Sequence, residues 1–171
     1  MRTLLLMRHA KSSWDDPELA DPERPLTARG RLAAPLVARH LRERGLTPEL
    51  VLCSHAVRSR ETWQLMSPVL GGGIASKTLR SLYPGTPGRL LEALRRVPDE
   101  VGTAMLIGHN PGLAQFAISL AGSGPKKAME RIASKFATAG VAVLSFELER
   151  WSALGAGNGR LESFVRPKDL G

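Results

Sequence analysis

Residues 3–11 read TLLLMRHAK, a short apolar run that stops at an arginine and a histidine. An apolar run of this length predicts a buried β-strand. Open α/β sheets bind their ligands at the carboxyl ends of such strands, so Arg8 and His9 stand at a favoured place for a site. Arg8 carries a permanent charge, whereas His9 can be neutral near physiological pH. The pair therefore suits an anion that is also attacked, such as a phosphoryl group; the alternative is two ordinary exposed polar residues.

The composition is that of a globular protein. The chain has 171 residues, 43% of them hydrophobic and 23% charged, and this length suits a single domain over residues 1–171. No apolar stretch is long enough for a membrane span, and residues 4–7 are too few for the core of a signal peptide. A single cysteine, Cys53, excludes an internal disulfide and fits a reducing compartment. We therefore expect a cytoplasmic protein without a membrane partner.

The chain carries a formal net charge of +8, from 24 basic against 16 acidic residues. Such a charge raises the question of nucleic-acid binding. The basic residues are spread along the chain, however, and aromatic residues make up only 5%, so few rings are present on which bases could stack. The charge supports an anionic substrate at least as well as a polynucleotide, and we expect no nucleic-acid partner.

The pattern of apolar residues predicts an alternation of strands and helices. The predicted strands cover residues 4–7, 50–53, 74–79, 103–107, 141–146 and 160–165. One predicted helix follows each of the first four strands, ending near residues 44, 70, 97 and 121. This alternation predicts a mostly parallel sheet with helices on both faces. The last two strands follow each other without a clear helix, so at least one strand is antiparallel. The expected fold is an α/β three-layer sandwich.

Polar residues at the helix starts give more local expectations. Thr27 is a predicted N-cap for the first helix and Ser54 for the second. The face of the second helix that is expected to be buried comprises Val57, Leu65 and Val69. Asn110 and Pro111 predict an N-cap and a first-turn proline for the fourth helix. Residues 122–127 form a predicted loop.

Three predicted strands lead to side chains that can bind phosphate. The first ends at Arg8 and His9, the second leads to Arg58, and the fourth ends just before His109. Because the carboxyl ends of parallel strands meet at one edge of a sheet, these side chains should converge there. Arg58 and His109 also lie next to helix N-termini, which favour anions through free N–H groups and the helix dipole. The sequence therefore predicts a phosphate site at this edge.

Three segments resemble motifs of the histidine phosphatase superfamily, whose fold is that of cofactor-dependent phosphoglycerate mutase. Residues 7–16 (MRHAKSSWDD) match its Arg-His-Gly-x-Ser-x-Trp pattern, with Ala10 in place of the usual glycine. Residues 53–62 (CSHAVRSRET) match its Ser-x-x-x-Arg pattern, and residues 106–113 (LIGHNPGL) match its Gly-His pattern. The Arg-Pro-Leu-Thr stretch at 24–27 is most similar to the SixA-type branch, the phosphohistidine phosphatases.

The resemblance implies a role for each of these side chains. His9 would be the nucleophile, taking the phosphoryl group on a ring nitrogen before water releases it. Arg8 and Arg58 would grip the phosphoryl oxygens, and His109 would donate a hydrogen bond to them. The arginine charges would also keep His9 neutral by lowering its pKa. Because arginines supply the charge that a metal ion supplies elsewhere, no metal and no cofactor are expected.

Further substrate-binding residues are predicted around this centre: Arg24, Ser12 and Asp15. Arg24 follows from the similarity to the SixA-type branch, and its alternative is a surface loop residue. Many family members carry asparagine where this chain has Asp15. A carboxylate at that position would repel phosphate unless it is protonated or turned away.

The leaving group decides between substrate classes. The family's phosphomonoesterases and mutases use a carboxylic acid between the second and third motifs to protonate the leaving alcohol, but residues 76–98 offer only Glu92, in a predicted helix. A phosphoramidate needs less help, because its imidazole nitrogen can already carry a proton. This favours phosphohistidine in a phosphorelay-type protein as the substrate. Acids of the first loop that could fold over the site and weaken this inference are Asp15, Asp16, Asp21 and Glu23.

Two alternatives stay open at this point. One is a phosphomonoesterase that acts on a small phosphorylated metabolite. The other is a non-catalytic protein that binds phosphate or nucleic acid through its positive charge.

Overall fold

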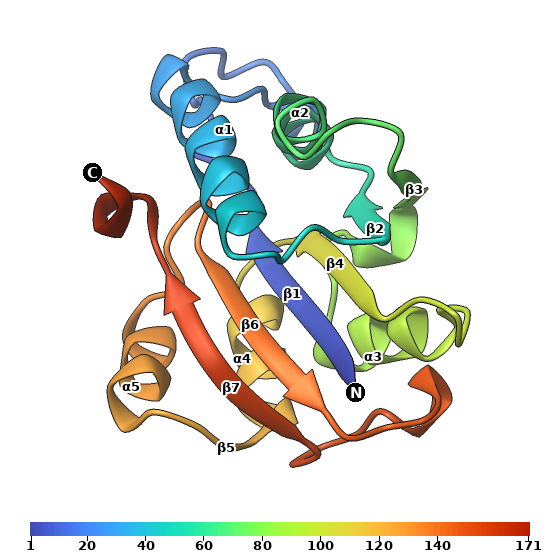
Figure 1. Cartoon of the computed structure of the whole chain (residues 1–171). Helices are drawn as coiled ribbons and strands as arrows, with labels where there is room; N and C mark the ends of the chain where they lie inside the picture. Colours follow the sequence, from blue (N-terminus) through green and yellow to red (C-terminus); the bar gives the residue numbers. More distant parts are fainter.

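The computed structural model describes residues 1–171, which form one seven-stranded sheet with helices packed against it (Figure 1). The strands are β1 (Arg2–Arg8), β2 (Leu50–Ser54), β3 (Ala75–Leu79), β4 (Thr103–Gly108), β5 (Ala121–Ser123), β6 (Val141–Phe146) and β7 (Gly159–Val165). The α-helices are α1 (Ala28–Glu43), α2 (Val57–Met66), α3 (Pro87–Arg95), α4 (Gly112–Leu120) and α5 (Lys126–Ser134). Short helical turns are η1 (Asp21–Glu23), η2 (Arg80–Leu82), η3 (Trp151–Ala153) and η4 (Pro167–Leu170). The strand order is β3-β2-β4-β1-β6-β7-β5.

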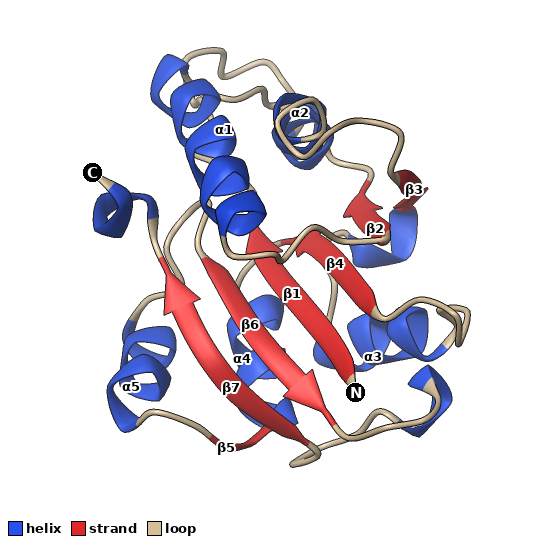
Figure 2. Ribbon diagram, viewed as in Figure 1, coloured by secondary structure: helices blue, strands red, loops and turns tan.

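Helices cover both faces of the sheet and make three layers (Figure 2). α1 and α2 lie over one face, and α3, α4 and α5 lie over the other. Strand β1 contributes to both interfaces because its side chains alternate between the faces. Leu4 and Leu6 pack with apolar residues of α3, α4 and α5, whereas Leu5 and Met7 pack with those of α1 and α2. This double burial is the reason that the start of the chain is continuously apolar. The expected α/β three-layer sandwich is confirmed.

One strand, β6, runs in the opposite direction to the other six. β1 is parallel to β4 and antiparallel to β6, and β2 is parallel to both β3 and β4. β6 is also antiparallel to β7, which in turn is parallel to β5. The predicted mixture of parallel strands with at least one antiparallel strand is therefore confirmed. Because β1, β2 and β4 lie side by side in the same direction, their carboxyl ends at Arg8, Ser54 and Gly108 meet at one sheet edge.

The start of α2 differs from the prediction. Its N-cap is Ala56 rather than Ser54, whose hydroxyl instead accepts the Ala56 N–H at 3.2 Å. The predicted apolar face, Val57, Leu65 and Val69, is only half-buried. The buried face of α2 comprises Arg58, Ser59, Thr62, Trp63 and Met66. Apolar spacing misplaces this face because α2 turns polar side chains inward, toward the sheet edge.

The chain after β4 departs from the predicted helix and loop. Asn110 is not the N-cap of α4, which is Pro111, although Asn110 Oδ1 still accepts the Ala114 N–H at 3.3 Å. β5 and α5 occupy residues 121–134, where the sequence predicts a loop over 122–127 and no helix. α5 is amphipathic, with Ala128, Met129 and Ile132 toward the core, but it covers only nine residues. None of the helices combines the length and the apolar character that crossing a membrane requires.

Candidate active site

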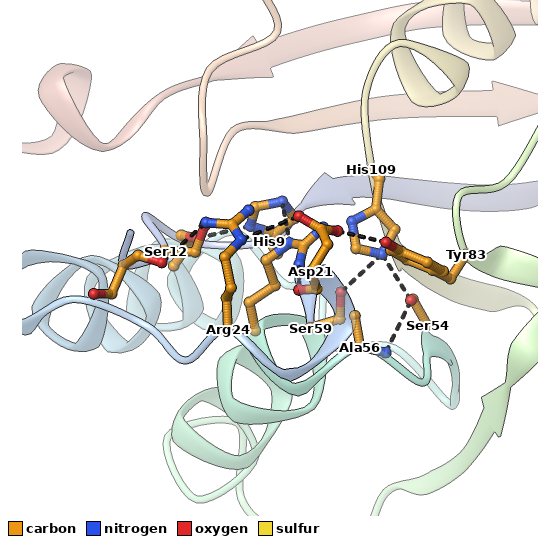
Figure 3. A network of polar contacts seen from close by, with 12 residues as sticks. His9, Ser12, Asp21, Arg24, Ser54, Ala56, Ser59, Tyr83 and His109 are labelled. Carbon is orange, nitrogen blue, oxygen red and sulfur yellow. Dashed lines mark hydrogen bonds and ion pairs between the residues drawn. The ribbon is translucent and has the colours of Figure 1, made fainter. Parts of the chain in front are cut away.

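His9 directly follows β1 and lies in a polar pocket at the carboxyl edge of the sheet (Figure 3). The residue is only 5% exposed. Its Nδ1 lies 2.8 Å from the carbonyl oxygen of Ala10. A carbonyl oxygen can only accept a hydrogen bond, so Nδ1 carries the ring proton and donates it there. The lone pair is therefore on Nε2, where it accepts a hydrogen bond from the Nε–H of Arg58 at 3.3 Å.

The pKa of His9 is lowered to about 3, so the ring is neutral at physiological pH. Burial is the largest cause, because it penalises the charged imidazolium. The charges of Arg58, Arg8 and Arg24 lower the pKa of His9 further, and the hydrogen bond to Ala10 opposes them. The arginine effect expected from the sequence has the right sign, but desolvation contributes more.

His109 follows β4 and faces His9 across the pocket, with ring centroids 5.1 Å apart. Its Nε2 lies 2.7 Å from the hydroxyl of Ser54, at the end of β2. In one of the two tautomers that this contact allows, Ser54 donates its own proton to Nε2 while it accepts the Ala56 N–H. The ring proton of neutral His109 is then on Nδ1, which is buried and has no hydrogen-bond partner. Since burial also lowers the pKa of His109 to about 3, Nδ1 of this tautomer is a neutral donor for a bound anion.

Arg58 lies in the first turn of α2 and is only 5% exposed. Besides its contact with His9, its Nη1 donates to the backbone carbonyl of Asp21 at 2.7 Å. Its Nη2 donates to the carboxylate of the same residue at 3.0 Å. The guanidinium predicted to bind phosphate is thus held beside His9, with an internal carboxylate as its partner.

Asp21, in η1, contributes more to the pocket than the sequence indicates. Its carboxylate also accepts hydrogen bonds from Arg24 Nε at 3.1 Å and from the Tyr83 hydroxyl. The Tyr83 hydrogen bond, followed by those of Arg58 and Arg24, holds the pKa of Asp21 well below its usual range. Among the loop acids it alone lines the pocket. An ionised carboxylate therefore contacts the same guanidinium groups that an anionic ligand would use.

Two more arginines border the pocket. Arg8 Nη1 donates to the Phe136 carbonyl at 2.9 Å, while its Nε is buried without a hydrogen-bond partner. Arg24 is 6% exposed and donates to the Ser12 hydroxyl at 3.0 Å. Its guanidinium carbon lies 3.4 Å from the centroid of the Trp14 ring, a cation–π contact. Arg24 is therefore a buried, fixed side chain and not a mobile loop residue.

The pocket has a volume of about 250 Å³. It brings together all but one of the predicted site residues: Arg8, His9, Ser12, Arg24, Arg58 and His109. Asp15 is exposed on the loop and does not line the pocket, and its contact with substrate stays a prediction. No group of three or more His, Cys, Asp or Glu side chains is arranged to hold a metal ion.

Gly112 brings the turn that carries Tyr83 against the loop that carries His109. A Cβ atom at Gly112 would lie 1.9 Å from the carbonyl oxygen of Gly85, so no larger residue allows this approach. The two loops meet in direct backbone contact as a result. The ring of Tyr83 then lies edge-on to His109, with centroids 5.2 Å apart.

The two buried histidines predict a loss of stability in acid. His9 and His109 have a pKa of about 3 when folded, against an ordinary value of 6.5. Between these values the unfolded chain binds protons that the folded protein does not, so stability falls as the pH drops from 6.5 toward 3. The expected loss is about 1.4 kcal/mol per pH unit for each histidine that stays neutral. Urea unfolding at pH 7 and pH 4.5 measures it, with a His109→Gln variant, which should lose part of the dependence. An equal free energy of unfolding at both pH values would contradict the shifted pKa values.

Comparison with known proteins places these residues in a wider context. A model of the histidine phosphatase superfamily (branch 1) matches residues 4–82. An uncharacterised protein of Mycobacterium tuberculosis is 38% identical over 164 residues, which cover 95% of this chain and 100% of the relative. The similarity therefore extends well beyond the three motifs.

Solved structures give the same picture. A candidate phosphohistidine phosphatase SixA from Nakamurella multipartitia has a TM-score of 0.84 and 28% identity, covering 97% of this chain and 96% of that one. A candidate phosphohistidine phosphatase SixA from Agrobacterium tumefaciens has a TM-score of 0.82 and 28% identity, covering 97% of this chain and 98% of that one. Both alignments include the late strands and α5, for which the sequence alone offers no motif.

Proposed function

We propose, because this chain belongs to the histidine phosphatase superfamily and to its SixA-type branch, that it dephosphorylates protein phosphohistidine through His9. The protein is a phosphatase, which sets aside the non-catalytic alternative. The observation that carries the proposal is the state of His9: its Nδ1 proton is bound to the Ala10 carbonyl, so the lone pair that would attack phosphorus is on Nε2. That lone pair accepts the Arg58 Nε–H, which would move to a phosphoryl oxygen when substrate binds. A neutral, fixed imidazole beside two guanidinium groups is suited to attack phosphorus.

The proposed reaction has two steps. The lone pair of His9 Nε2 forms a bond to phosphorus, while the bond from phosphorus to the substrate's imidazole nitrogen breaks and leaves its electron pair on that nitrogen. Water then attacks the phosphoryl group on His9, which releases inorganic phosphate, a proton and the free imidazole. In both steps Arg8, Arg58 and the Nδ1–H of His109 would stabilise the charge on the phosphoryl oxygens.

We infer that no metal ion takes part. The pocket is lined by only one carboxylate but by four cationic side chains: Arg8, Lys11, Arg24 and Arg58. They supply the positive charge that a divalent cation provides in other phosphoryl-transfer enzymes.

The choice of phosphohistidine rests on the leaving group. Asp21 is ionised and bound to Arg58 and Arg24, so it has no proton to give to a departing alkoxide. The imidazole of phosphohistidine can carry the required proton itself, and needs no acid from the enzyme. The pocket therefore supports cleavage of a phosphorus–nitrogen bond over hydrolysis of an alkyl ester.

The substrate class is tested by giving the enzyme both kinds of phosphate. One arm uses a histidine phosphotransfer domain phosphorylated on histidine, and the other uses phosphoserine, p-nitrophenyl phosphate and sugar phosphates. The proposal expects kcat/KM to be highest on the phosphorylated domain. Activity on the esters with none on the phosphorylated domain would instead assign a phosphomonoesterase for a small metabolite.

Asp21→Asn is expected to tighten the binding of phosphate analogues. The carboxylate competes with a bound anion for Arg58 and Arg24, and asparagine keeps the shape without the charge. Because the Asp21 side chain is 42% exposed, we expect a gain of about two- to fivefold, as for an ion pair of up to about 1 kcal/mol. Calorimetric titration with vanadate measures it, with Glu23→Gln of the same turn as the control. Weaker binding would mean that the carboxylate positions Arg58 and Arg24 for the anion instead of competing with it. Slower hydrolysis of poor leaving groups only would mean that Asp21 acts as a proton donor.

We also propose that residues 1–171 form one domain that works in the cytoplasm. In support, both apolar clusters pack against the same sheet. The single cysteine, Cys53, is buried and its pKa is raised to about 12 by burial, so it is inert in a reducing compartment.

A further inference from the structure

A groove of basic side chains, called here the cationic groove, lies beside the pocket that holds His9. Its volume is about 430 Å³. Its basic side chains are Arg8 at the end of β1 and Lys11 after it, Arg29 in α1, Arg131 and Lys135 at the end of α5, and Arg166 and Lys168 after β7. No acidic side chain lines the cationic groove. Four separate segments of the chain thus bring charge of one sign to one place.

The charge of the cationic groove is largely uncompensated. Among its basic side chains only Arg166 forms an ion pair, with Asp169 at 2.8 Å. The exposed members are Lys11, Arg29, Lys135 and Lys168. Like charges that gather on one surface repel one another and do not stabilise the fold. Their arrangement is therefore better explained by an anionic ligand than by the needs of folding.

The cationic groove adjoins the phosphate pocket. Arg8, Lys11 and Thr138 line both. A substrate whose phosphoryl group contacts His9 therefore leaves the pocket past these residues and has the cationic groove next to it. The pocket itself, at about 250 Å³, can hold a phosphoryl group and the side chain that carries it, but not the protein surface around that side chain.

The lining of the cationic groove narrows the choice of ligand. It contains no aromatic ring, so it offers no platform for a nucleobase. Sites for small molecules are usually enclosed and mostly apolar, with a few fixed polar groups. The cationic groove differs, because its main apolar side chains are only Ala33 and Ala137. Exposed lysines on separate segments suit carboxylates spread over a protein surface, where complementary charge speeds association and fixes orientation.

We propose that the cationic groove docks acidic side chains that surround the phosphohistidine of a protein substrate. This inference rests on the proposed function, because it places the phosphoryl group of that substrate on His9. It adds what the pocket alone does not specify: the phosphorylated protein is recognised by a patch of carboxylates beside the modified histidine.

The test reverses two charges outside the catalytic pocket. A Lys135→Glu, Lys168→Glu double variant is compared with Lys77→Glu, Arg89→Glu, which changes the net charge equally near β3 and α3, at the other end of the sheet. Each is assayed on a phosphorylated histidine phosphotransfer domain with acidic residues around its histidine, and on p-nitrophenyl phosphate. The groove variant is expected to lose about tenfold in kcat/KM on the phosphorylated domain, with a weaker dependence on salt. Both variants should keep wild-type activity on the small ester.

Each other outcome has a separate meaning. Wild-type enzyme that fails on the phosphorylated domain overturns the proposed function, and this inference with it. Wild-type enzyme that succeeds, with equal kcat/KM in the groove and control variants, overturns this inference alone. A groove variant that loses binding of a single-stranded oligonucleotide but keeps its activity on the phosphorylated domain would assign the groove to nucleic acid and overturn it as well. Circular dichroism and thermal melting establish that both variants are folded.

Discussion

His9→Ala is expected to lower phosphatase activity by at least about a thousandfold, because it removes the only group placed to attack phosphorus. The buried imidazole has its proton fixed on Nδ1 and its lone pair on Nε2, and no neighbour reproduces that state. The measurement is phosphate release, together with trapping of acid-labile phosphate on the enzyme. His40→Ala is the matched control, since His40 lies on α1 and lines a different cavity.

The trapping experiment gives this prediction its sharpest form. Wild-type enzyme should carry the acid-labile label and the His9→Ala variant should carry none. Equal labelling of both proteins would place the nucleophile elsewhere, and His109, with its ring 5.1 Å from that of His9, would be the residue to examine.

Arg58→Ala is expected to cost about a hundred- to a thousandfold in kcat, the scale of losing one preorganised group that stabilises transition-state charge. The substitution removes a buried guanidinium at the nucleophile and leaves the Asp21 carboxylate without that partner, where it repels phosphate. Arg58→Lys should recover part of the activity, because lysine restores the charge but not the two-pronged geometry. Steady-state kinetics on the phosphorylated domain measure all three proteins.

Arg60→Ala is the control for this variant. Arg60 is on the same helix, but it is exposed and its Nε donates to the His55 carbonyl at 2.9 Å, away from the pocket. Similar losses in both variants would mean that any charge on α2 serves equally well. A rise in KM with kcat unchanged would restrict Arg58 to binding the ground state.

Much of the catalytic pocket follows from the sequence because topology alone brings it together. Adjacent parallel strands place their last residues at the same edge, so Arg8, His9 and His109 meet there whatever the loops do. Arg58 adds to them because it lies in the first turn of the helix that follows β2. A pattern of short apolar runs separated by helices predicts the common direction of these strands, whereas their order in the sheet comes from the structure.

The parts that the sequence does not predict depend on contacts between loops. Asp21 meets the hydroxyl of Tyr83, 62 positions further along, through side-chain hydrogen bonds that leave no periodic pattern. Ser54 is a residue type that often forms a helix N-cap. Because it lies at the end of β2, its hydroxyl instead forms a hydrogen bond with His109. The sequence does not predict α5, because its apolar face of Ala128, Met129 and Ile132 spans little more than one helical turn.

The pocket is lined by residues from both outer layers of the fold. Arg58 belongs to α2, which covers one face of the sheet. His109 lies just before α4, which covers the other face. A phosphoryl group held by both residues joins layers whose apolar clusters the sheet otherwise keeps apart. By mass action, such a ligand strengthens the whole fold and not one helix. We therefore expect bound phosphate to raise the free energy of unfolding of both layers together.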